Sequence, residues 1–167
     1  FGGEMGNEEA GSGGVWGSVR RAGGGEVVKK EVTGVFVGPS PMDIARGEER
    51  NKLDSCVQSK KPEILSRVNG AGIGIQKMFS RIPPKEAASM TELNCTALTE
   101  ITGLCLPYCR KGSRIFMLAS AAAFVPQPGF GVYAASKAYV VSFSSALNRE
   151  FKPRKTHVTA ICPGPLE

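Results

Sequence analysis

The sequence predicts an α/β fold with a doubly wound parallel sheet, and three observations support this prediction. Short apolar runs alternate with longer segments of helical periodicity between residues 64 and 162. The resulting order of strand, helix, strand, helix and strand favours parallel strands that are joined by crossover helices. Residues 115–119 are all apolar, which is typical of a strand that is covered on both faces.

Local signals set the expected bounds of each element. Pro107 is expected to bend the first helix, Lys152 and Pro153 to end the second, and Pro163 with Gly164 to stop the last strand. The expected elements are, in order, strand 64–69, helix 85–110, strand 114–120, helix 133–151 and strand 157–162.

Composition divides the 167 residues, a length that suits one domain, into two parts. Residues 1–60 hold 13 of the 21 glycines, with 8 basic and 9 acidic residues, whereas residues 61–167 hold 13 basic and 6 acidic residues. We expect the first part to be loop-rich, with one strand candidate at residues 26–37, and the second to be the organised, catalytic part. Because the chain begins with Phe1, we expect it to be a fragment or a degraded copy of a longer chain.

Composition also argues against several classes of protein. No apolar run approaches the roughly 18–20 residues that span a bilayer, and no secretory signal is recognised, so we expect no membrane partner. Five cysteines without a Cys-x-x-Cys pair, beside a single histidine, argue against a metal site and a disulfide framework. Free thiols in a cytoplasmic protein agree better with this pattern.

An isolated lysine marks the candidate site. Residues 115–148 contain one charged residue, Lys137, and Tyr133 lies one helical turn before it on the same face. An ammonium beside a phenol favours the phenolate, which prepares the tyrosine to exchange a proton with a carbonyl or alcohol oxygen. Ser120 ends the preceding strand, where ligands of open α/β sheets bind. The structural alternative is a core tyrosine, a lysine with a buried stem and a serine that closes a strand.

The segments around these residues resemble a known family. The matching segments are residues 68–72 (VNGAG), 93–94 (LN), 119–123 (ASAAA), 126–138 (PQPGFGVYAASKA) and 158–164 (VTAICPG). They are similar to the core of the short-chain dehydrogenase/reductase family over residues 64–167, and the Tyr-x-x-x-Lys block is the specific part. The resemblance implies a Rossmann-like sheet, incomplete here at both ends, and hydride transfer between NAD or NADP and a small carbonyl or alcohol substrate.

The resemblance also implies a role for each matching residue. Tyr133 would be the general acid/base, Ser120 the hydroxyl that orients the substrate, and Lys137 the cation that holds the cofactor ribose. Asn94 would anchor a water that relays protons to Lys137. The residues that would line the cofactor site are Asn69, Ala71, Gly72, Tyr133, Lys137, Pro163 and Gly164.

Two departures from the family pattern concern the cofactor. Gly70 stands where the family has a second asparagine. The family's Gly-rich phosphate loop has only partial counterparts at residues 33–40 and 2–6, in a segment where such glycine spacings arise by chance. We therefore expect the chain to bind a nicotinamide cofactor weakly.

Two alternatives to an enzyme stay open. One is an inactive, non-enzymatic remnant that only packs against a homologous subunit. The other is a small basic nucleic-acid-binding domain, suggested by the net charge of +6, although the charges are dispersed and only 7% of residues are aromatic. We prefer an enzyme without a nucleic-acid partner. Family members pair their two central helices between subunits, so we expect a homo-oligomer through Ala97, Cys105, Ala138, Val141 and Ala146.

Overall fold

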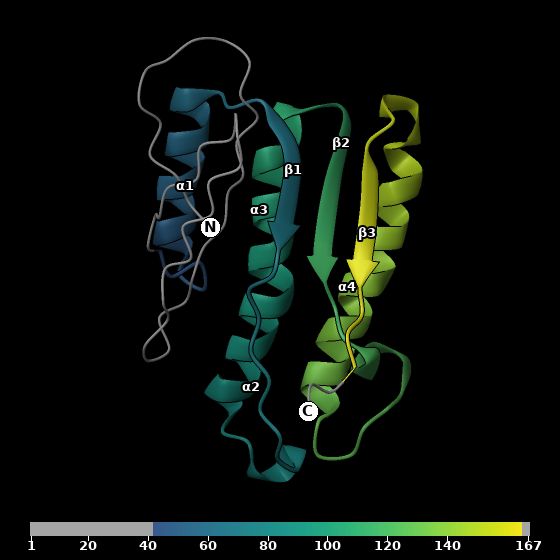
Figure 1. The fold of residues 1–167 in the computed structure, drawn as a ribbon. Helices are drawn as coiled ribbons and strands as arrows, with labels where there is room; N and C mark the ends of the chain where they lie inside the picture. The colour runs from purple at the N-terminus through teal and green to yellow at the C-terminus, as the bar shows by residue number, and fades with distance from the viewer. Residues whose placement is uncertain (1–41, 165–167) are drawn as a thin grey trace.

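The computed structural model describes residues 42–164, which form a three-stranded parallel sheet with helices packed against it (Figure 1). The helices are α1 (Gly47–Lys60), α2 (Pro84–Thr91), α3 (Leu98–Cys105) and α4 (Gly131–Glu150). The strands are β1 (Ile64–Asn69), β2 (Cys109–Leu118) and β3 (His157–Ile161). A π-helical turn, Glu92–Ala97, joins α2 to α3. The predicted parallel α/β fold is confirmed, because β2 pairs in parallel with both of its neighbours.

The strand register brings the three strand ends to one edge of the sheet. Asn69 pairs with Met117, and Leu118 pairs with Ile161. At the opposite edge the register shifts between Ile64 and Ser66, where β2 carries extra residues. Gly112 has a φ of +87° within these extra residues, a conformation that favours glycine. The shared edge of strand ends is where ligands of open α/β sheets bind.

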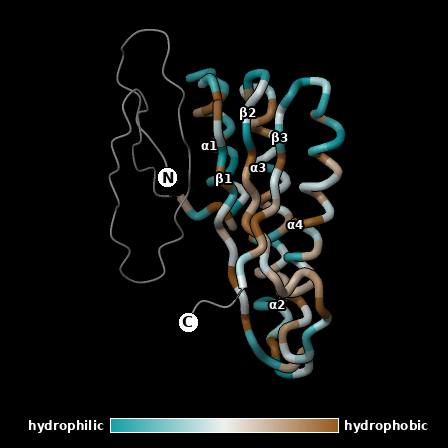
Figure 2. The backbone as a smooth tube through the Cα atoms, turned by 45° about the vertical axis from the view of Figure 1, so that its right-hand side comes forward, coloured by the Kyte–Doolittle hydropathy of each residue, from teal (hydrophilic) through white to brown (hydrophobic). Residues whose placement is uncertain are grey.

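The hydrophobic core lies between the sheet and the helices. Its buried residues include Ile64, Ile115, Met117 and Val158 from the strands, Leu93, Ala97, Ile101 and Cys105 from the helical segment 84–105, and Val140 and Leu147 from α4. On the other face of the sheet Val68 and Ile161 are exposed within the described residues. Hydrophilic residues gather at the edge where the strands begin (Figure 2).

This core corrects one expectation about assembly. Ala97 and Cys105, which we expected to face a second subunit, are only 0% and 2% exposed. They point into the core of their own chain and cannot form an intersubunit surface. Within residues 42–164, no helix combines the length and the apolar character needed to cross a membrane.

The expected bounds of β1 are confirmed, and those of the later helices and strands are corrected. The helix predicted at residues 85–110 ends at Cys105, and a 3₁₀ turn that contains Pro107 follows it. Proline favours such an end because it lacks an N–H and clashes with the preceding turn. The strand expected at residues 114–120 therefore begins earlier, at Cys109, and ends at Leu118. The predicted helix 133–151 and strand 157–162 differ from α4 and β3 by one or two residues at their ends.

The first part of the chain contains a helix that we did not predict. Helix α1 occupies residues 47–60 of the segment that we expected to be loop-rich. The strand candidate at residues 26–37 and the glycine motifs at residues 2–6 and 33–40 lie outside the described residues.

Candidate functional site

Ser120 lies two residues beyond the end of β2, at the edge where the strands end. Its backbone is extended, and its Oγ accepts a hydrogen bond of 3.2 Å from the N–H of Ala122 at the start of a 3₁₀ turn. The N–H of Ala121 donates to the carbonyl of Pro163, 2.9 Å away, and so ties this turn to the segment after β3. A serine hydroxyl that accepts from the backbone in this way can still donate its own proton to a ligand.

Lys137 is a buried cation on α4, only 4% exposed. Its Nζ donates to the carbonyl of Leu118 at 2.8 Å and lies 5.6 Å from the centroid of the Tyr133 ring. Burial lowers the pKa of Lys137 from its usual value, while the nearby thiols of Cys95 and Cys162 act in the opposite direction. The predicted juxtaposition of Tyr133 and Lys137 is thus present, at the end of the strand that leads to Ser120.

Asn94 connects the π turn to two other segments. Its side chain, in a residue that is 1% exposed, accepts from the N–H of Ile73 and donates to the carbonyl of Ile73, both at 2.9 Å. Its amide also donates to the Oγ of Ser136 at 2.9 Å, and that hydroxyl donates to the carbonyl of Tyr133 at 2.7 Å. Both polar atoms of the Asn94 side chain therefore have protein partners. Both protons of its amide nitrogen are engaged, whereas Oδ1 accepts one hydrogen bond of the two that it can accept.

Two glycines let the segment after β1 approach these side chains. A Cβ on Gly72 would lie 3.1 Å from Oδ1 of Asn94 and 3.2 Å from Nζ of Lys137. A Cβ on Gly74 would lie 2.9 Å from Cδ2 of Tyr133 and 3.1 Å from Cζ of Phe130. A side chain at position 72 would press on the ammonium and on Asn94, so glycine allows the close approach of this segment.

The other predicted cofactor residues lie near this edge, but they differ in what they contact. The Asn69 side chain donates to Oγ1 of Thr102 at 3.0 Å and accepts from Nε of Arg67 at 2.8 Å. It therefore fastens β1 to α3. Ala71 is half-buried against the core, whereas Pro163 and Gly164 are exposed beyond β3.

Sequence reasoning missed three residues of the site. Phe130 stacks on Tyr133 with ring centroids 4.3 Å apart. Ser136 bridges Asn94 to α4, and Gly74 packs on the Tyr133 ring. The alternation of glycine at positions 70, 72 and 74 was a signal for close backbone approach, but no local signal identified Ser136 as a bridge.

The cluster combines groups that can hold an oxygen and exchange a proton with it. The phenol of Tyr133 is half-buried, the ammonium of Lys137 is buried beside its ring, and the hydroxyl of Ser120 lies at the same sheet edge. Among residues 42–164, histidine, cysteine and acidic side chains form no group of three that could bind a metal ion. Proton transfer assisted by a neighbouring cation is the chemistry that this donor set supports.

Comparison with known proteins identifies one family in both its model and its curated relatives. Residues 17–167 match the family described as short chain dehydrogenase. A very-long-chain 3-oxoacyl-CoA reductase of Phaeosphaeria nodorum is 32% identical over 124 residues, which cover 72% of this chain and 36% of the relative. A probable short-chain type dehydrogenase/reductase of Helicobacter pylori is 36% identical over 128 residues, covering 75% of this chain and 47% of the relative. The chain thus spans about half or less of these relatives.

Solved structures share the fold. The bulky-bulky ketone specific alcohol dehydrogenase of Comamonas testosteroni superposes with a TM-score of 0.70 at 24% identity. The match covers 78% of this chain and 53% of that protein. The parallel sheet described above is therefore part of a Rossmann-like fold.

The buried ammonium gives a prediction about stability and pH. Because burial lowers the pKa of Lys137, the folded state releases this proton at lower pH than the unfolded chain does. The free energy of unfolding of the wild type should therefore rise, relative to Lys137→Met, as pH increases from neutrality towards 10.5, the usual value. Urea unfolding of both proteins across this range measures the difference. A difference that stays constant or falls contradicts the burial of a charged Lys137.

The close contact at Gly74 gives a second prediction. Gly74→Ala should cost about 1–3 kcal/mol of unfolding free energy, because the rings of Tyr133 and Phe130 must move to admit a methyl group. Gly103→Ala is the matched control: a Cβ there meets nothing within 4 Å, and alanine in α3 should stabilise by up to about 1 kcal/mol. Denaturant unfolding and the NMR shifts of the Tyr133 ring report the two effects. Wild-type stability and ring shifts in Gly74→Ala would contradict the contact.

Proposed function

The chain belongs to the short-chain dehydrogenase/reductase family, and on that premise we propose that it carries the catalytic part of an NAD(P)-dependent oxidoreductase. The reaction is hydride transfer between the nicotinamide cofactor and a carbonyl or alcohol substrate. The observation that carries this proposal is the buried Lys137 ammonium, 5.6 Å from the Tyr133 ring and bonded to the strand end that leads to Ser120.

Tyr133 and Ser120 act on the substrate oxygen. In the direction of reduction, the phenol of Tyr133 gives its proton to the carbonyl oxygen, and the hydroxyl of Ser120 donates a hydrogen bond to the same oxygen. The backbone N–H of Ala122 already occupies one acceptor position of Ser120 Oγ, which favours this donating role. Lys137 favours the phenolate that remains, because a nearby cation stabilises negative charge.

The residues around Lys137 suit a nicotinamide nucleotide. The ammonium has three donors, and among residues 42–164 its one protein acceptor is the carbonyl of Leu118. Gly72 leaves the ammonium uncovered, so ribose hydroxyls can reach the remaining donors. When bound, the cofactor supplies or accepts the hydride. The choice between NAD and NADP stays open, although one structure that shares the fold is a complex with NADPH.

Asn94 has a different role from the one its side chain first suggests. Both side-chain polar atoms bind Ile73 and Ser136. We infer that a proton-relaying water at Asn94 would bind an acceptor, either Oδ1 or the backbone carbonyl, because both amide protons are already donated. The side chain then keeps the 70–74 segment and α4 in position on either side of Lys137.

Several related expectations stay proposals. The relative from Phaeosphaeria nodorum is named a very-long-chain 3-oxoacyl-CoA reductase, which favours a carbonyl substrate here. The convergence of Ser120, Tyr133 and Lys137 at one sheet edge favours an enzyme over an inactive remnant, and we expect no nucleic-acid partner.

All five cysteines are free thiols, which agrees with a cytoplasmic location.

A homo-oligomer remains part of the proposal, through an outer surface of α3 and α4. Tyr139 on α4 is 40% exposed, hydrogen-bonds to Thr99 of α3 at 2.6 Å and stacks on Phe143. Ala138 and Val141 are half-buried on the same helix, and Ala146 is exposed. Aromatic residues of this kind are enriched at protein interfaces.

The proposed activity predicts the effect of Tyr133→Phe. The variant should lose at least about two orders of magnitude in kcat for ketone reduction, the scale of a lost general acid. The assay follows oxidation of NADH or NADPH, and circular dichroism confirms that the variant is folded. Near wild-type turnover by the variant would rule out Tyr133 as the proton donor.

The proposed interface predicts a change in molecular mass. Sedimentation at micromolar concentration should give an oligomer for the wild type, and Tyr139→Glu should shift it towards monomer because a charge would be buried. Glu150→Gln, at the exposed end of α4, is a control that should keep the oligomer. A strictly monomeric wild type would contradict the interface.

A further inference from the structure

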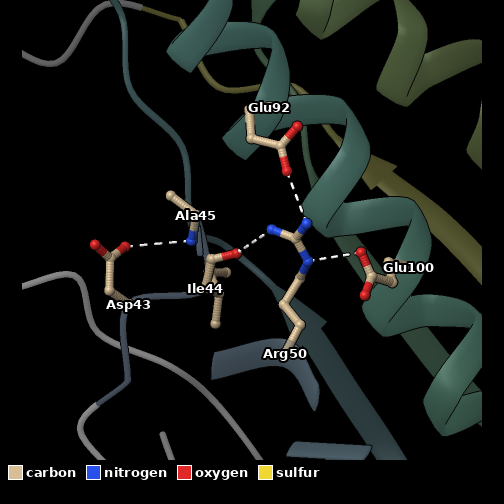
Figure 3. Close-up of polar contacts among 6 residues, drawn as sticks. All are labelled: Asp43, Ile44, Ala45, Arg50, Glu92 and Glu100. Atoms are coloured by element: carbon tan, nitrogen blue, oxygen red, sulfur yellow. Dashed lines mark hydrogen bonds and ion pairs between the residues drawn. The ribbon is translucent and has the colours of Figure 1, made fainter. Parts of the chain in front are cut away.

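Arg50 is a buried cation on α1 that reaches the helix carrying Asn94. It is 6% exposed, and each of its three guanidinium nitrogens donates a hydrogen bond (Figure 3). Nε binds Glu100 at 2.6 Å, Nη2 binds Glu92 at 2.7 Å, and Nη1 binds the carbonyl of Ile44 at 2.8 Å. The fixed, planar fork of arginine suits three acceptors in three directions, whereas the ammonium of lysine does not.

The two carboxylates belong to the start of the π turn and to the helix that follows it. Glu92 is the first residue of that turn, and Glu100 lies in the first turn of α3. In a regular α-helix, eight residues rotate by about 800°, which leaves the two side chains about 80° apart around the axis. A π turn takes in one extra residue, so the same eight residues complete about two full turns. Glu92 and Glu100 therefore point to the same side because the π turn is present.

The same π turn places Asn94. If the segment returned to regular α-helix, the residues before α3 would rotate by about 100° relative to it. Asn94 would then lose its alignment with the N–H and carbonyl of Ile73 and with Ser136. The contacts of Arg50 and those of Asn94 thus depend on one local helical geometry.

We propose that Arg50 is a positioning residue: by binding Glu92 and Glu100 together it holds the π turn, and through that turn it holds Asn94. We call Arg50, Glu92 and Glu100 the Arg50 clamp. Its importance for catalysis rests on the function proposed above, whereas its effect on Asn94 does not. The clamp also links α1 and the residues just before it to the π turn that carries Asn94.

The test is hydrogen exchange at the amide of Ile73, which donates to Asn94 Oδ1. In Glu92→Gln and Glu100→Gln, exchange at Ile73 should increase about tenfold or more relative to Val140 in the core, the scale of one weakened hydrogen bond to a charged group. The double variant should add little to either single one, because loss of one carboxylate already releases the clamp. Arg50→Lys should behave as the single variants do.

The control is Glu49→Gln, which removes an exposed ion pair with Lys52 on the same helix and should leave the exchange ratio unchanged. An unchanged ratio of exchange at Ile73 to that at Val140 would overturn the clamp, whether neither amide is accelerated or both are accelerated equally through a general loss of stability. The exchange ratio can be measured in the conservative Glu→Gln variants, even where a larger substitution at Arg50 prevents folding.

Kinetics separate this inference from the proposed function. In an active protein, the two Glu→Gln variants should lower kcat and leave KM for the ketone near the wild-type value. Faster exchange at Ile73 without hydride transfer in any protein, wild type included, would reject the proposed function and retain the clamp. Hydride transfer with an unchanged exchange ratio would reject the clamp alone.

Discussion

The site depends on the burial of one positive charge, the ammonium of Lys137. A buried charge is costly unless it is hydrogen-bonded or paired, and among the described residues Lys137 has the carbonyl of Leu118 and no carboxylate. Its lowered pKa reflects this burial. Groups of this kind concentrate at functional sites because their perturbed environment serves a reaction. The cost in stability is the physical reason to regard Lys137 as functional.

The surrounding structure makes this burial possible and uses it. The parallel register brings the ends of β2 and β3 together. At this edge the carbonyl of Leu118 accepts a hydrogen bond from Lys137, and Ser120 follows two residues later. Glycine at position 72 lets the backbone approach the ammonium closely, and the π turn places Asn94 against the same segment. These features come from four parts of the chain that meet at one sheet edge. The geometry of Ser120, Tyr133 and Lys137 is therefore set by parts of the fold outside these three residues.

The sequence predicted those features that arise from the periodicity or spacing of neighbouring residues. The alternation of strands and helices, the bounds of β1 and the Tyr133–Lys137 pair were readable because each has its own periodicity or spacing. Helix α1 was missed because it has few apolar residues, and Arg50 fastens it to glutamates 42 and 50 positions away. The π turn and the Ser136 bridge have no sequence signature, since they exist only through contacts between distant segments. The place of Asn69 beside the cofactor stays a prediction, and the bonds of its side chain to Arg67 and Thr102 were not foreseen.

The most direct measurement of the central claim is isotope transfer from a nicotinamide cofactor that carries deuterium at its hydride position. The protein is incubated with the labelled cofactor and a panel of ketones, and the alcohols are analysed by mass spectrometry and NMR. We predict deuterium on the carbon that bears the new hydroxyl group, with the hydroxyl proton supplied from solvent through Tyr133. Unchanged ketones with both labelled NADH and labelled NADPH, or an alcohol without deuterium on that carbon, would contradict it.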